Sequence, residues 1–189
     1  VKPPKRSAHI LCNRYPGVAS PRALLVHGGE GEGGIILNDL WWLDLDELAA
    51  GRQSWQCVET EGSNARSNHA AILDEDCLYV FGGVRAKREA LANLEILDLE
   101  TKTWHTPVVS GVPPPPRWNP TLVLYKNASF KCLVCFAGND GKQHLDDLFT
   151  FNLDTHEWVQ PQIGYGAAPP RMTDHAAAVV DGVMVVFGG

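Results

Sequence analysis

A short apolar run that ends in two small residues occurs four times along this chain of 189 residues. The four copies lie at residues 24–29, 78–83, 133–138 and 184–189. The last small residue therefore recurs at spacings of 54, 55 and 51 residues. A period this regular indicates one supersecondary unit copied along the chain. Because such a unit cannot bury its apolar faces alone, the copies must stack against one another.

Each copy contains further positions that recur in the same order. A second apolar run is followed by a tryptophan, and then by a Gly- and Pro-rich connection that ends in an arginine. The runs are 40–45, 94–99 and 148–153, the tryptophans are Trp55, Trp104 and Trp158, and the arginines are Arg66, Arg117 and Arg171, with Arg6 in the same register at the start. Each arginine opens another apolar run, so the unit has four short segments. Copy one has five extra residues before Trp55, which we expect to form a loop.

The four segments of a unit have the properties of β-strands. They are about five or six residues long, turn residues separate them, and no helical period of 3.6 residues is present. Residues 24–26 and 133–136 are apolar on both faces, as in strands that are covered on both sides. Four-stranded sheets stacked face to face around an axis give this double burial. The sequence therefore predicts an all-β fold, a β-propeller.

The recurring residues resemble those of Kelch repeats. The resemblance is carried by the small pair, the Leu-Asp-Leu or Phe-Asn-Leu run, the Thr103-Trp104 type of fourth strand and the Pro-Pro-Arg lead-in, and it covers the chain from Arg6 to Gly189. It implies one incomplete Kelch-type β-propeller domain over residues 1–189, with about three and a half four-stranded antiparallel blades. The expected blades are 6–58, 66–107 and 117–161, and residues 171–189 supply the first two strands of a fourth.

Two departures from the repeat pattern predict local adjustments of the backbone. Ala137 stands where the other copies have glycine, and Trp118-Asn119-Pro120 follows Arg117 where His69 and His175 occur in the other copies. We also expect the chain to be a segment of a longer protein, because the third and fourth strands of blade four would lie beyond residue 189.

Composition excludes some classes of function. The formal charge is −6 and the pI is about 5.6, without a basic stripe, which argues against a nucleic-acid binder. No apolar run is long enough to predict a membrane span. Five cysteines without disulfide-dense spacing favour a reducing compartment, so we expect a cytoplasmic or nuclear location.

Most recurring polar residues are interpreted as structural. The tryptophans are expected to pack between blades because of the large area that an aromatic side chain buries. Arg66, Arg117 and Arg171 are expected to join one blade to the next by donating to carbonyls, or else to line the mouth of the central channel. His9, His69 and His175, at the starts of first strands, are expected to be satisfied structural residues.

Three motifs that suggest a cofactor or metal have simpler explanations. Gly29 to Gly34 matches G-x-G-x-x-G, but an extended segment follows it where a dinucleotide fingerprint needs a helix. Cys132 and Cys135 would point to opposite faces of a strand, as core residues. Asp146-Asp147 is interpreted as turn chemistry at the start of a third strand. The sequence therefore predicts no cofactor, no metal site and no catalytic residues.

The predicted function is recognition of a protein or peptide partner. In an up-and-down blade, the second-to-third-strand loops leave from the same face as the connections between blades. These loops (30–37, 84–92 and 139–145) and connections (59–65, 108–116 and 160–169) differ most between copies, and variable loops on a rigid scaffold often carry recognition. The expected partner contacts are Glu30, Glu32, Arg85, Lys87, Arg88, Arg117, Asn139, Asp140 and Lys142.

Two other functions stay open at this point. Some Kelch-type propellers resemble copper-radical oxidases or metal-assisted lyases, so this chain could be part of such an enzyme with its ligands in missing blades. The propeller could also only space or oligomerise other domains. Pro113 to Pro116 would stiffen one connection as polyproline II, either as a rigid spacer or as a ligand for an aromatic groove.

Overall fold

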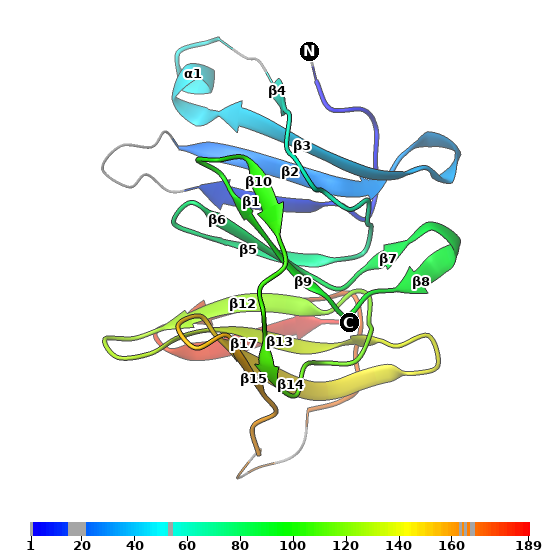
Figure 1. Cartoon of the computed structure of the whole chain (residues 1–189), viewed down its shortest axis with the longest axis vertical. Coiled ribbons are helices and arrows are strands. Elements are labelled where there is room, and N and C mark those ends of the chain that lie inside the picture. Colours follow the sequence, from blue (N-terminus) through cyan, green and yellow to red (C-terminus); the bar gives the residue numbers. More distant parts are fainter. Residues whose placement is uncertain (1, 15–21, 53–54, 163, 165, 167–168) are drawn as a thin grey trace.

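The computed structural model describes residues 2–14, 22–52, 55–162, 164, 166 and 169–189, and most of them lie in β-sheets (Figure 1). The first sheet contains β1 (Ile10–Arg14), β2 (Ala23–Glu30), β3 (Ile36–Asp44) and β4 (Trp55–Val58). The second contains β5 (Ala70–Asp74), β6 (Cys77–Phe81), β9 (Leu94–Asp98) and β10 (Thr103–His105). The third contains β12 (Thr121–Lys126), β13 (Lys131–Asn139), β14 (His144–Asn152) and β15 (Glu157–Val159), and β16 (His175–Val180) pairs with β17 (Val183–Gly188).

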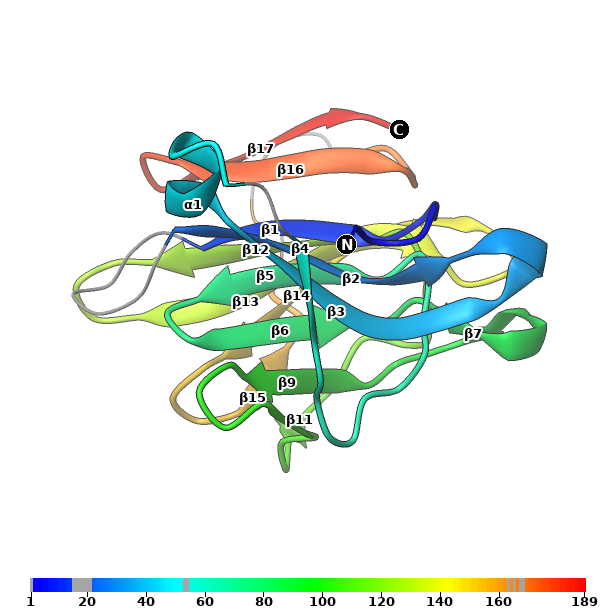
Figure 2. The ribbon, with the colours of Figure 1, turned by 90° about the horizontal axis from the view of Figure 1, so that it is seen from above.

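These sheets are the blades of a propeller. Within each of the first three, the four repeat strands pair with their sequence neighbours in antiparallel order, and the fourth consists of the β16–β17 hairpin. The first strands β1, β5, β12 and β16 contact one another in that order, so the blades share an inner side. Figure 2 shows β11 (Ser110–Gly111) and β15 on the side of the molecule away from β1 and β16. The predicted all-β propeller is confirmed.

The hydrophobic core lies between blades. One cluster joins Leu25 and Leu40 of blade one to Leu78 and Trp104 of blade two. A second cluster joins blade two to blade three and includes Trp158. A third packs β13 of blade three against β16 and β17. Trp104 and Trp158 thus pack against the preceding blade, which confirms the prediction that these tryptophans are interblade residues.

The small pairs allow main chains of different segments to approach closely. A Cβ atom on Gly83, whose φ is +88°, would lie 2.6 Å from the Ser67 carbonyl oxygen. At Gly82 it would lie 2.7 Å from the Arg117 carbonyl oxygen. Ala137 keeps the left-handed conformation of the glycines at this position, with a φ of 55°. The departure at Ala137 therefore does not change the backbone.

The connections between blades add a strand to the outer edge of the next blade. In the first connection, Glu61 forms a parallel bridge with Thr103 of β10. In the second, β11 pairs in parallel with β15. This edge pairing was not predicted. The third connection, expected at 160–169, lies partly outside the described residues.

The expected loop before Trp55 contains a short helix. Residue 45, which was assigned to a strand, begins α1 (Leu45–Ala49). The Asp44 side chain caps this helix by accepting hydrogen bonds from the backbone N–H groups of Asp46 and Glu47, at 2.8 and 3.0 Å. An aspartate at this position satisfies amide donors that have no partner within the helix, so the strand ends at Asp44.

Candidate partner-binding groove

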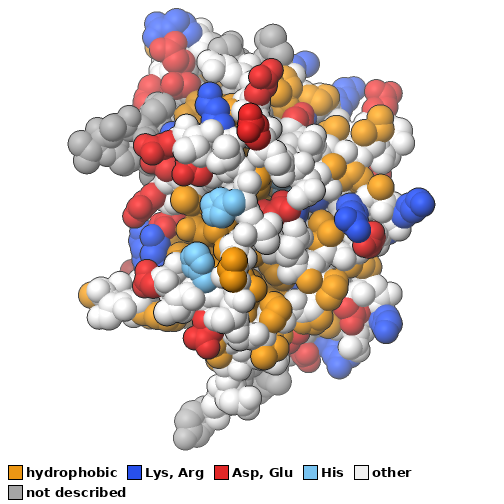
Figure 3. Space-filling view, in the orientation of Figure 1, with side chains coloured by type: hydrophobic (Ala, Val, Ile, Leu, Met, Phe, Trp, Pro, Cys, Tyr) orange, Lys and Arg blue, Asp and Glu red, His pale blue; other side chains and the backbone are white. Residues whose placement is uncertain are grey.

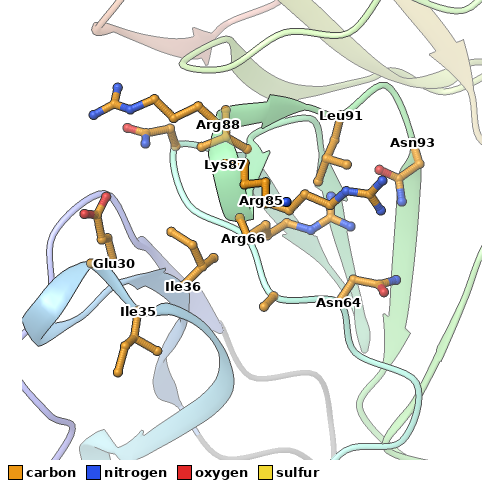
Figure 4. Close-up of a pocket in the computed structure, with 15 residues that line it drawn as sticks. Glu30, Ile35, Ile36, Asn64, Arg66, Arg85, Lys87, Arg88, Leu91 and Asn93 are labelled. Carbon is orange, nitrogen blue, oxygen red and sulfur yellow. The ribbon is translucent and has the colours of Figure 1, made fainter.

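A groove of about 670 Å³ opens where three variable segments of blades one and two converge. Its lining includes the loop between β2 and β3, the loop between β6 and β9, and the connection from blade one to blade two. Figure 4 shows Glu30, Ile35 and Ile36 on one side of this space, and Arg85, Lys87 and Arg88 on the other. The predicted loop face therefore contains a real concavity.

The basic side of the groove is a small hairpin within the loop between β6 and β9. It consists of β7 (Val84–Arg85), the 3-10 turn η2 (Ala86–Arg88) and β8 (Glu89–Ala90). Lys87 and Arg88 occupy the turn with φ of 64° and 58°, and both side chains are exposed. Arg85 pairs with Glu89 at 2.6 and 2.7 Å, whereas Lys87 and Arg88 form no ion pair within the described part of the chain. Lys and Arg side chains gather over this hairpin in Figure 3.

The floor of the groove involves Arg66, one of three buried or half-buried arginines that recur in the blades. In blade one, Arg6 binds both oxygens of Asp39, at 2.6 and 2.7 Å, and donates to the Gly28 carbonyl at 2.9 Å. In blade three, Arg117 binds both oxygens of Asp147 and donates to the Ala137 carbonyl at 3.0 Å. We name each of these sets an arginine clamp.

The clamp of blade two differs in its acid. Arg66 is fully buried, pairs with Glu95 at 2.6 Å and donates to the Gly82 carbonyl at 3.1 Å. Asn93 occupies the third-strand position that carries the acid in the other blades, and its amide donates to Glu95 at 2.8 Å. As a result, the acid is two residues further along the chain, on the same side of the strand.

The clamp of blade two also contains polar atoms without a partner beside the groove. Nε of Arg6 donates to the Pro4 carbonyl and Nε of Arg117 to the Pro115 carbonyl, at 3.3 and 3.1 Å. Nε of Arg66 is buried and has no hydrogen-bond partner among the residues that the structure describes, and the same is true of Oδ1 of Asn93. Both atoms are closed off from solvent, so they are unpaired polar groups of the fold itself and offer no contact to a ligand in the groove.

The main chain of each clamp arginine bonds to the preceding blade. Arg66 donates its N–H to the Leu37 carbonyl and accepts from the Gly29 N–H, at 3.1 and 2.9 Å. Arg117 makes the same two bonds with Leu91 and Gly83, also at 3.1 and 2.9 Å. Because the side chain bonds within its own blade, each arginine joins two blades. The predicted interblade role of Arg66 and Arg117 is confirmed.

The third arginine was placed in the wrong register. Met172 makes the equivalent main-chain bonds, to Leu145 and Gly138, and lies three residues before His175 as Arg66 lies before His69. Arg171 is instead exposed, 3.6 Å from Asp146. The interpretation of Asp147 as turn chemistry was also wrong, because it is the carboxylate of the third arginine clamp.

The seam between blades one and two, which we name the first seam, contains a buried pair of histidines. Nδ1 of His27 lies 3.2 Å from Nε2 of His69, and the His27 ring packs against Trp104 with centroids 4.9 Å apart. Burial, together with the nearby charge of Arg66, lowers the pKa of His27 to about 3. Burial likewise lowers the pKa of His69. Both rings are therefore neutral at physiological pH.

The predicted contact residues divide into two groups. The groove brings together Glu30, Arg85, Lys87 and Arg88, whereas Glu32, on the same loop as Glu30, is exposed outside its lining. Asn139, Asp140 and Lys142 lie on the turn between β13 and β14. There the side chains of Asn139 and Asp140 accept hydrogen bonds from backbone N–H groups of their own turn.

Arg117 does not fit the predicted contact set. Its side chain is fully buried in the clamp of blade three, so it offers no surface to a partner. Sequence reasoning also missed Ile35, Ile36, Asn64 and Asn93, which line the groove. The signal for Asn93 was available, since it replaces an aspartate that copies one and three have at this position.

A profile of the KLHDC2/KLHL20/DRC7 Kelch-repeats domain matches residues 1–189. The chain belongs to the Kelch-repeat family. It is 33% identical over 198 residues to human (Homo sapiens) host cell factor 1. This alignment covers 94% of this chain and 9% of that protein. It is also 30% identical over 197 residues to the Rab9 effector protein with kelch motifs of Rattus norvegicus. That alignment covers all of this chain and 50% of the relative. The Kelch chain thus spans at most half the length of these two relatives.

The glycine- and cysteine-containing motifs lie as their structural interpretations predicted. The segment after Gly29 continues through the short turn η1 (Glu32–Gly34) into β3, and not into a helix that could receive a pyrophosphate. Cys132 and Cys135 pack in different core clusters, on opposite faces of β13. Among the described residues, no group of three or more His, Cys, Asp or Glu is placed to hold a metal ion. The described helices are also too short to cross a bilayer.

Proposed function

We propose that the groove between blades one and two binds an acidic segment of a protein partner, and that the chain acts as a protein-interaction module of a larger adaptor or scaffold. The observation that carries this proposal is a basic rim that faces an apolar wall across one groove. Lys87 and Arg88, which form no ion pair with a described residue, supply the rim, and Ile35 and Ile36 supply the wall.

The charge distribution favours an acidic partner at this place. The chain as a whole carries a formal charge of −6, so the β7–β8 hairpin is a local basic region on an acidic molecule. Opposite charges across an interface raise the association rate and select the partner more than they raise affinity. Glu30 lies on the other wall, so one side of the groove carries an acidic residue and the opposite side is basic.

The apolar wall supplies the contact area that charges alone lack. Ile35 is 64% exposed and Ile36 lies beside it, facing the groove together with Leu91. Burying such side chains against a partner gains about 25 cal/mol per Å² of apolar surface. An acidic segment with one or two apolar side chains would therefore fit both walls.

The comparisons support a protein partner. The name of the Rab9 effector protein with kelch motifs attributes an effector role to a relative, half of whose length aligns with the whole of this chain. All five cysteines of the chain are free, which supports the proposal that the module works in a reducing compartment such as the cytoplasm or nucleus.

The test is a selection from a random peptide library on the wild-type chain, followed by binding measurements with the enriched peptides. We expect enrichment of aspartate and glutamate, and about tenfold or greater loss of affinity in K87E/R88E, because two interface charges are reversed. The matched control is K102E, which reverses the charge of an exposed turn residue on the opposite face and is compared with K87E alone. Equal losses in the two variants, or enriched peptides without acidic residues, would contradict the proposal.

A further inference from the structure

The connection between blades two and three exposes an unusual number of apolar side chains. Val108 is 91% exposed, Val112 is 64% exposed and Val109 is 40% exposed. Three of the four prolines that follow, Pro113, Pro115 and Pro116, are exposed as well. In Figure 2 this segment projects around β11, at the outer edge of blade three, and hydrophobic side chains gather near β15 in Figure 3.

The segment is held rigidly at both ends of its exposed part. Ser110 donates its N–H to the His156 carbonyl and Val112 to the Trp158 carbonyl, both at 3.0 Å. A Cβ atom on Gly111 would lie 2.0 Å from the Trp158 carbonyl oxygen, so only glycine allows this approach. At the other end, Nε of the buried Arg117 donates to the Pro115 carbonyl at 3.1 Å.

The burial pattern has a period of three residues. Pro114 and Arg117 are buried, whereas residues 112, 113, 115 and 116 are exposed. A polyproline II helix has three residues per turn and no internal hydrogen bonds. One edge of such a helix therefore faces the blade, and the other two edges, Val112 with Pro115 and Pro113 with Pro116, face solvent.

The fold does not need apolar residues at this place. The connection between blades one and two occupies the same position, and Glu61 pairs with Thr103 there as Ser110 pairs with Glu157. Its sequence, Glu59 to Ala65, is polar and contains no proline. The exposed valines and prolines of residues 108–116 are thus a property of one connection and not of the repeat.

We infer that residues 108–116 form a second docking site, for a partner domain with an aromatic-lined groove that binds polyproline II segments. Such grooves read two adjacent edges of a preformed, low-entropy helix. The two exposed edges meet this requirement, and the anchored ends remove the ordering cost that a free proline-rich peptide would still pay. Because Arg117 is buried, the recognition would depend on proline and valine contacts and not on a flanking basic charge.

The experiment measures binding of the purified chain to isolated WW, SH3 and EVH1 domains by titration calorimetry. We expect at least one domain class to bind, and P113S/P116S to weaken that binding by about tenfold or more while the unfolding midpoint stays unchanged. The matched control, P169S/P170S, changes two prolines in the equivalent connection before blade four and should retain the wild-type affinity.

Three results would overturn the inference. The first is that none of the three domain classes binds the wild-type chain. The second is that P113S/P116S binds as well as the wild-type chain does. The third is that V108S/V112S abolishes self-association of the chain in sedimentation experiments, which would assign the exposed valines to contact with a second copy. K87E/R88E should leave this binding unchanged, so failure here and failure at the groove are distinguishable.

Discussion

The first seam and the seam between blades two and three, the second seam, share a main-chain frame but differ in their side chains. In both, a clamp arginine bonds to the preceding blade at 3.1 and 2.9 Å. In both, the residue two positions after that arginine donates its N–H inward: Asn68 to Ala8 and Asn119 to Asn68, at 2.9 and 2.8 Å. The repeat therefore determines how the blades are joined, whatever side chains surround the joint.

The side chains of the first seam are the more polar. His27 and His69 lie at the first seam, whereas Phe81 packs against Trp158 with centroids 5.4 Å apart at the second. The three side-chain nitrogens of Arg117 all donate hydrogen bonds, whereas Nε of Arg66 has no acceptor within the described part of the chain. The groove opens beside the first seam. A few substitutions on a common frame thus convert one joint between blades into a candidate binding site.

The largest expected difference between the clamps comes from removing their acids. Glu95→Ala leaves the fully buried Arg66 without its ion-pair partner and should destabilise the chain by about 3–5 kcal/mol. Asp147→Ala should cost about 1–2 kcal/mol, because Asp147 is partly exposed and Arg117 keeps its two carbonyl acceptors. Urea unfolding measures both. Similar losses of unfolding free energy in the two variants would mean that the clamps do not differ as described. Glu89→Ala, at an exposed residue, serves as the control and should have no measurable effect.

Substitutions of the glycines at the two seams test whether both seams share the same main-chain frame. A Cβ on Gly29 or Gly83 would lie 2.6 Å from the carbonyl oxygen of Ser7 or Ser67, so Gly29→Ala and Gly83→Ala should each cost about 2–4 kcal/mol. The two costs should agree to within about 1 kcal/mol, because the frame is the same at both seams. Gly33→Ala, at a positive φ with no atom within 4 Å of the new Cβ, isolates the backbone contribution alone. Chemical unfolding that shows Gly29→Ala to be as mild as Gly33→Ala would contradict a common frame.

Acid should weaken the first seam. When the pKa of a histidine is lower in the folded state than in the unfolded state, a falling pH protonates the unfolded state first. The neutral side chain therefore makes its full contribution to the stability of the folded state at neutral pH. This contribution is lost as the pH falls below about 6.5 towards the folded value of about 3. For His27 the loss between pH 6 and pH 4.5 should be about 2 kcal/mol.

His27→Phe, which copies Phe81 and Phe136 of the other blades, is the matched variant for this pH effect. The free energy of unfolding measured across this pH range should fall less steeply in His27→Phe than in the wild-type chain. Parallel curves would show that the buried histidines do not cause the acid sensitivity.

The smallest expected effect concerns a residue one or two positions before each first strand. Asn68, Asn119 and Asp174 have φ of 55°, 50° and 56°, and Ala8 has the same conformation with a φ of 52°. Asparagine tolerates this left-handed region better than alanine does. Ala8→Asn should therefore stabilise the chain by about 0.5–1 kcal/mol, measured as a rise in melting temperature. A lower melting temperature would mean that contacts of Ala8 outweigh its backbone strain.

Sequence patterns predicted the parts of the molecule that depend on apolar periodicity. The strands of each blade, the interblade tryptophans and the opposite faces of Cys132 and Cys135 all follow from side chains that recur or alternate. The register error at Arg171 has a physical reason, since the recurring bonds are made by the main chain, which Met172 provides as well as arginine does.

The candidate site was predictable only in part. The basic residues of the 84–92 loop were visible as charge, but the groove requires knowledge of which loops converge. The clamp carboxylates were missed because Asp39, Glu95 and Asp147 do not occupy one sequence position: the acid of blade two is shifted by two residues. Such a shift keeps the same side of a strand, which only the folded sheet reveals.

The most direct test of the account is a titration of the chain, labelled at isoleucine and leucine methyl groups, with the tightest acidic peptide from the library selection. We predict that the NMR signals of Ile35, Ile36 and Leu91 shift together with the same affinity, while that of Leu145, which lies where blade three meets blade four, stays in place. Shifts centred on Leu145, or on the β13–β14 turn, would place the partner on blade three and contradict the assignment of the groove.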